Sequence, residues 1–166
     1  VMTSLKTAQA IATALSLVTA TNPASGTSID YTGIKATAKR ITVMFSEIST
    51  TGTDNVIVQI GDSGGIESSG YKGGSFNVST TAVTTSGFDC SCQNNAVAII
   101  SGQITLTRIT STLWAASGVF CTSGSGGYVA SVGGSKDLSG TLDRLRITTT
   151  GGTATFDGGI INILVE

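Results

Sequence analysis

The sequence predicts an all-β protein, folded as an antiparallel, jelly-roll-like β-sandwich of about seven to nine strands. Apolar and polar residues alternate in most of the segments rich in Val, Ile and Thr, which is the pattern of strands with one buried face. The composition agrees, with 22 glycines and one proline, because this bias favours short strands and tight turns over helices. An open barrel is the alternative arrangement.

The first 26 residues differ from the rest of the chain. Apolar residues follow one another at three- and four-residue spacing, which predicts a packing seam if the segment is helical: Leu5, Ala8, Ala12 and Leu15. The threonines and the run at 15–19 favour an extended strand instead, so helix and strand both stay open. We expect residues 1–26 to form an arm or connector used for attachment or trimerisation, and residues 27–166 to form the β-sandwich domain.

The first half of the predicted domain contains three strands. A short strand is expected at 27–31, before Gly33, and a longer one at 39–48, where Ile41, Val43 and Phe45 alternate with the residues of the other face. The third lies at 55–61, after a turn at 50–54. Residues 62–95 are expected to be rich in loops, because glycine pairs and polar residues interrupt the pattern.

The second half carries the longest strand candidate, at 96–109, which returns through a second strand at 113–121. Trp114 lies among small residues in the returning strand, and we expect it in the core. A glycine-rich loop is predicted at 123–134. The last two strands are expected at 142–149 and 160–165, and Arg144 and Arg146 on the first of them are expected to pair with acids near strand ends.

Composition excludes several classes of function. Only 11% of the chain is charged and its net charge is −1, whereas nucleic-acid binding relies on clustered Lys and Arg. No apolar run reaches the ~20 residues that span a bilayer, and no segment has the pattern of a secretory signal. We therefore expect neither nucleic-acid binding nor membrane insertion, and a product made in the cytoplasm of its host.

The residue types also argue against an enzyme and against a cofactor. The chain has no histidine, so a Ser-His-Asp or Cys-His arrangement cannot form within it. Its three cysteines include a Cys-x-Cys pair, which is a poor zinc site without histidine, and we expect buried thiols and no metal. A glycosidase would need two carboxylates, for which the loops offer candidates: Asp54, Asp62, Glu67 and Asp89. We expect Asp54 and Asp62 to be solvated turn formers.

Several segments together resemble the carboxy-terminal domain of tail fibres and related virion proteins of tailed bacteriophages. The similarity is clear in 27–71 and 135–166 and weaker in 72–134. Residues 35–38 depart from the family, where relatives commonly carry a proline and a bulky aromatic residue. The segments that carry the resemblance, all of them strands and turns, are residues 28–34, 39–45, 58–67, 138–147 and 156–159.

The resemblance implies a structural virion protein without enzymatic activity, most consistent with a tail fibre or its tip that attaches to the host surface. The alternatives are a capsid cement or head-decoration protein and, third, a carbohydrate-active enzyme. We expect a homotrimer, packed through residues 1–26 and one apolar sheet face, with other virion proteins bound by the same segment. Contact with a bacterial surface glycan or protein is predicted at residues beside glycine-rich loops: Tyr71, Lys72, Phe76 and Tyr128.

Overall fold

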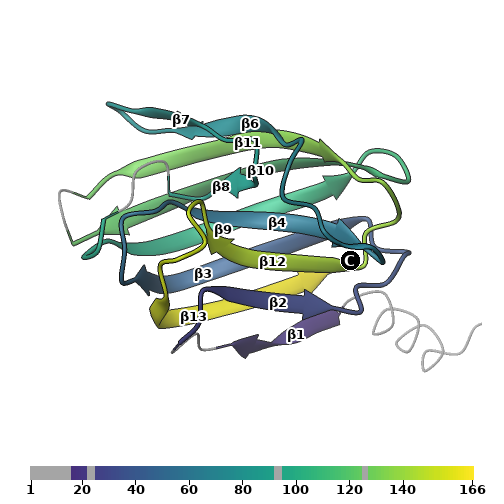
Figure 1. Ribbon diagram of the computed structural model, residues 1–166, viewed down its shortest axis with the longest axis horizontal. Helices are drawn as coiled ribbons and strands as arrows, with labels where there is room; N and C mark the ends of the chain where they lie inside the picture. The colour runs from purple at the N-terminus through teal and green to yellow at the C-terminus, as the bar shows by residue number, and fades with distance from the viewer. Residues whose placement is uncertain (1–15, 22–24, 92–94, 125–126) are drawn as a thin grey trace, which may run out of the picture.

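The computed structural model describes residues 16–21, 25–91, 95–124 and 127–166, which form thirteen strands in two antiparallel sheets (Figure 1). The all-β sandwich that the sequence predicts is confirmed. Three of the strands have only two or three residues, and these short strands account for most of the excess over the expected number.

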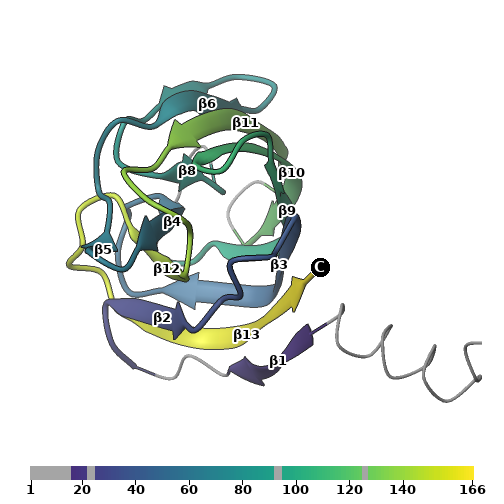
Figure 2. The ribbon, with the colours of Figure 1, turned by 90° about the vertical axis from the view of Figure 1, so that its right-hand side faces the viewer.

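The larger sheet has eight strands, which adjoin one another in the order β1-β13-β3-β9-β10-β11-β6-β7. In the end-on view of Figure 2 it curves around the smaller sheet. The bounds of its strands in chain order are β1 Ser16–Thr21, β3 Arg40–Thr50, β6 Lys72–Phe76, β7 Thr81–Val83, β9 Ile99–Arg108, β10 Leu113–Ser123, β11 Val129–Asp137 and β13 Phe156–Val165.

The smaller sheet has five strands. Four of them follow the order β2-β12-β4-β5, and β8 pairs with β4 beside β5. The bounds in chain order are β2 Ser28–Thr32, β4 Val56–Asp62, β5 Gly65–Ile66, β8 Phe88–Asp89 and β12 Arg144–Thr149.

The pairing is that of a jelly roll. The first strand pairs with the last, β1 with β13, and the second with the last but one, β2 with β12. Further inward, β3 pairs with β9 and β4 with β8. The chain is thus wound as one long antiparallel hairpin rolled into a sandwich, and β10, β11, β6 and β7 widen the larger sheet.

The core lies between the two sheets and follows the alternation in the sequence. Along β3, Ile41, Val43 and Phe45 are buried while the residues between them are more exposed. The ring of Phe45 packs against Phe120 of β10 at 5.4 Å between centroids. Trp114 is buried, as predicted.

β3 contains a bulge in its pairing with β9, on the side opposite its other neighbour, β13. The pairing register shifts between Phe45 and Ile48, and Glu47 has a positive φ of 56°. Gly159 of β13 faces the bulge, where a Cβ atom would lie 2.5 Å from the carbonyl oxygen of Glu47. Only glycine allows this close approach, which lets the larger sheet curve around the core.

The structure revises the expected boundaries in two places. β1 pairs with β13 in the larger sheet, so the sheet begins within the segment expected to be a separate arm; residues 1–15 lie outside the described residues. The predicted loop at 123–134 contains the start of β11, whose Gly133 and Gly134 pair with Gly74 and Gly73 of β6. A Cβ atom on Gly73 would lie 2.2 Å from the Gly133 carbonyl oxygen, so glycines that suggest a loop are required here for strand contact.

Candidate functional site

Tyr71, the first predicted contact residue, belongs to the core, so its prediction as an exposed contact is wrong. Its side chain is 2% exposed and its ring packs edge-on against Phe88 at 5.0 Å. Its hydroxyl accepts a hydrogen bond from the Ile60 backbone N–H at 2.7 Å and donates one to the Glu67 carbonyl at 2.9 Å. Tyr71 therefore fastens the segment after β5 to β4.

The other three predicted contact residues do not form one site. Lys72 is exposed at the first residue of β6, and Phe76, 58% exposed, stands at the last. Tyr128 is partly buried, and its hydroxyl donates to the Ser91 carbonyl at 2.6 Å. Lys72 and Phe76 are four positions apart along β6, a distance of ~13 Å. Of the two, Phe76 lies among other exposed apolar side chains, which are described below.

The loop carboxylates that could have served a glycosidase are held by neighbouring groups. Asp62 is buried, and its carboxylate accepts hydrogen bonds from the Gly64 N–H and the Ser139 hydroxyl, which hold its pKa below its usual range. It forms a turn as predicted, but it is not solvated. Glu67 pairs with Lys136 at 2.5 Å, and its other oxygen accepts from the Ser139 N–H. These contacts join the two sheets at one end of the sandwich.

The cysteines give a mixed result. Cys90 is buried, as predicted, and burial raises the pKa of its thiol. Cys121 is exposed on β10, so its predicted burial is wrong, and Cys92 lies outside the described residues. Within the described ranges, no three side chains of His, Cys, Asp or Glu are grouped so that they could hold a metal ion.

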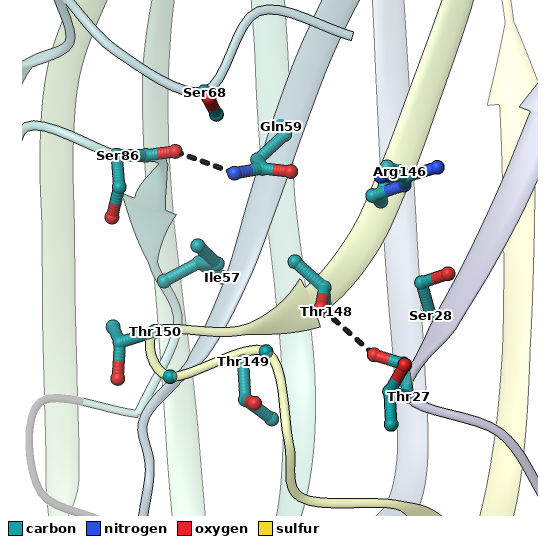
Figure 3. Close-up of a pocket in the computed structure, with 12 residues that line it drawn as sticks. Thr27, Ser28, Ile57, Gln59, Ser68, Ser86, Arg146, Thr148, Thr149 and Thr150 are labelled. Atoms are coloured by element: carbon teal, nitrogen blue, oxygen red, sulfur yellow. Dashed lines mark hydrogen bonds between the residues drawn. The ribbon is translucent and has the colours of Figure 1, made fainter.

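A polar groove of about 320 Å³ lies on the outer face of the smaller sheet (Figure 3). Its floor is formed by β12 and β4, and the segments before β2 and before β8 contribute to its sides. The twelve lining residues are mostly hydroxyl-bearing: Thr27, Ser28, Ile57, Gln59, Ser68, Ser86, Arg146, Thr148, Thr149, Thr150, Gly151 and Gly152.

Gln59 stands at the centre of this groove and is fixed in place. It is 6% exposed, and its amide nitrogen donates to the Ser86 carbonyl at 2.8 Å. In Figure 3 the amide oxygen is turned away from Ser86 towards Arg146. Gln59 was not among the predicted site residues, although its position was a signal: it is the one amide in β4, Val56–Asp62, and interrupts an otherwise apolar run from Val56 to Ile60.

The charges beside the groove are paired. Arg146 binds both carboxylate oxygens of Asp30, with its Nε 2.6 Å and its Nη2 2.8 Å away, and the pKa of Asp30 is lowered as a result. Arg144 pairs with Asp143 at 2.7 Å. Both arginines pair with acids, as predicted, although Asp30 lies in the middle of β2 and not near its end. The Thr148 hydroxyl donates to the Thr27 carbonyl at 2.8 Å, which joins the end of β12 to the residue before β2.

The outer face of the larger sheet is very different. The strand register places on this face alternate residues of β9 and β10, and none of them is charged. They are Ile99, Ser101, Gln103, Thr105, Thr107, Leu113, Ala115, Ser117, Val119, Cys121 and Ser123. On β11 and β6 the outward positions carry charge only at Asp137 and Lys72, at one end of the strands.

Exposed apolar side chains gather on this face, which we call the uncharged face. Val119 of β10 is level with Ser131 of β11 and Phe76 of β6, and Val129 is the next outward residue along β11. Val83 of β7 continues the group beyond β6. All four apolar side chains are more than half exposed. Apolar side chains gathered on an exposed face are a feature of interaction surfaces.

Searches against protein-family models, curated proteins and solved structures return no match to this chain. Among the described residues no helix is long and apolar enough to cross a membrane. The two outer faces are therefore interpreted from their own chemistry.

Proposed function

We propose that this protein is a non-enzymatic structural component of a bacteriophage particle, a tail fibre or its tip, that assembles as a homotrimer. The uncharged face carries the proposal. An eight-stranded sheet whose central outward positions are Ser, Thr, Ala and Val suits close packing against like chains, because nothing charged must lose its water there.

The size of the face also supports self-assembly. The five long strands β13, β3, β9, β10 and β11 are ~33 Å long and, spaced ~4.8 Å apart, span ~19 Å; with the shorter β6 they give a face of ~700 Å². A stable protein interface buries ~800 Å² on each partner. In the proposed trimer this face and residues 1–26 meet the neighbouring copies, and other virion proteins bind through residues 1–26.

Two further observations favour this function. Jelly rolls recur in viral capsid and lectin domains, and the segments that resemble phage fibre domains include β2, β3, β4 and β12. The carboxylates Asp62 and Glu67 are engaged by Ser139 and Lys136, an arrangement that suits a structural loop better than acid–base catalysis.

The assembly is tested by light scattering on Val119→Lys. We expect the unchanged chain to have three times the mass of 16.7 kDa at micromolar concentration. Val119→Lys should be monomeric, because it buries an unpaired charge in each interface. The matched control is Thr32→Lys on the exposed outer side of β2, which should leave the mass unchanged. A monomeric unchanged chain, or equal masses for the two variants, would contradict the assembly.

The place in the particle is tested by labelling virions with antibodies raised against the purified chain. Label at the tail supports the fibre. Label spread across the head supports the capsid cement protein instead, and absence of label from purified particles overturns a virion role.

A further inference from the structure

We propose that the groove on the outer face of the smaller sheet binds a neutral, linear oligosaccharide of the host surface. This inference rests on the proposed attachment function and names the ligand class and its site. It replaces the predicted contact residues, because Tyr71 is buried and the other three are not gathered in one place.

The first argument is the hydrogen-bonding capacity that the groove keeps available. Gln59 is held by Ser86 so that its amide oxygen faces the groove (Figure 3). The hydroxyls of Ser28 and Ser68 also line it, and neither has a hydrogen-bond partner among the described residues. A fixed acceptor beside rotatable hydroxyls, which both donate and accept, matches sugar hydroxyls, which do the same.

The second argument is charge. Arg146 is the cationic side chain in the groove lining. Its Nε and Nη2 groups each donate a hydrogen bond to one carboxylate oxygen of Asp30. The pair leaves the groove without net charge, whereas sites for phosphate or acidic sugars expose an unpaired guanidinium. The guanidinium retains further N–H groups that can donate to a neutral hydroxyl. A neutral ligand is therefore favoured over an anionic one.

The third argument is shape. Beside the groove, which is about 320 Å³, a second depression of about 200 Å³ is lined by Asp30, Arg144 and Gly65 among others. Arg146 lines both depressions, so the two follow β12 in line. A chain of sugar units fits two adjoining polar depressions better than a single compact ligand does. Three copies of a weak site would bind a cell surface by avidity.

The experiment uses the full chain on an array of neutral and acidic bacterial polysaccharides, followed by calorimetric titration of the best ligand. Ser68→Trp places a bulky ring over the groove, and we expect it to weaken binding by ~10-fold or more, since several hydrogen bonds are lost together. The matched control is Ser111→Trp, in the exposed turn between β9 and β10, which should bind like the unchanged chain. Circular dichroism confirms that both variants fold.

Binding to neutral glycans that is lost in Ser68→Trp and kept in Ser111→Trp supports the proposal. Binding to acidic glycans alone, binding unaffected by Ser68→Trp, or no binding on the array overturns it. None of these outcomes bears on the mass from light scattering or on the tail label, so the proposed virion role stands or fails separately.

Discussion

The two sheets of this sandwich share one core but present opposite kinds of surface to solvent. The central strands of the larger sheet, β9 and β10, turn outward uncharged side chains, and on β11 and β6 the outward charges Asp137 and Lys72 lie at one end of the strands. The smaller sheet turns outward Arg144, Arg146 and Asp30, all of them paired, around a polar groove. The contrast is the one expected if, as proposed, the larger sheet packs against other protein chains.

The difference arises from the same alternation of residues in each sheet. In β10 the inward positions hold Trp114 and Phe120, and the outward ones are small and uncharged. In β12 the inward positions hold Leu145 and Ile147, and the outward ones hold two arginines. Inward residues therefore form the core of the sandwich, and outward residues give its two faces their different chemistry.

The largest effect on stability is expected from a substitution in the core, which the two sheets share. Phe120→Ala should lower the free energy of unfolding by about 3–5 kcal/mol, because it leaves a cavity beside Phe45. The adjacent outward residue supplies the control: Val119→Ala should cost less than ~0.5 kcal/mol in the dissociated chain. Urea unfolding at a concentration that keeps the chain monomeric measures both, and similar losses for the two variants would refute the assignment of faces.

A smaller effect is expected from acid, through carboxyl groups of the smaller sheet and its loops and through Glu166, whose pKa is lowered by Arg40 of β3. Arg146 lowers the pKa of Asp30, and Ser139 lowers that of Asp62. Burial acts to raise the pKa of Glu67, but Lys136 and Ser139 together hold it below its usual range. Since these carboxyls bind protons less readily when folded, their stabilisation is complete above the unfolded pKa of ~4 and is lost as the pH falls through the lower folded values.

The melting temperature should therefore be level from about pH 5 to pH 8 and should fall below about pH 4. Self-association should be unchanged at pH 5, because the outward positions of β9 and β10 hold no carboxylate. Thermal unfolding and light scattering over the same pH series provide the two readings. A level melting temperature down to pH 3, or dissociation of the folded protein at pH 5, would contradict this division.

Strands could be predicted from the sequence where apolar and polar residues alternate regularly. They could not be predicted where glycines bring two strand backbones into close contact. β3, β9, β10 and β12 follow from their patterns, whereas β6 and β11 pair through glycines that suggest a loop. Periodicity cannot distinguish a glycine needed for strand contact from one needed for a turn.

The site was less predictable than the fold. The sequence predicted that Arg146 pairs with an acid but not that this acid is Asp30, since the partner depends on strand register. Tyr71, beside glycines, resembled an exposed loop residue, but the position of its hydroxyl against β4 buries it. The groove combines residues from β2, β4, β12 and four connecting segments, which no local pattern brings together.

Hydroxyl-radical footprinting at two protein concentrations tests the contrast between the faces most directly. Met44, Phe76 and Cys121 report on the larger sheet, and Arg146 and Ile66 on the smaller one. We predict that raising the concentration from nanomolar to micromolar protects Phe76 and Cys121 and leaves Arg146 and Ile66 equally reactive. Protection of Arg146 and Ile66 with Phe76 and Cys121 unchanged would contradict the account, because the smaller sheet would then be the covered face.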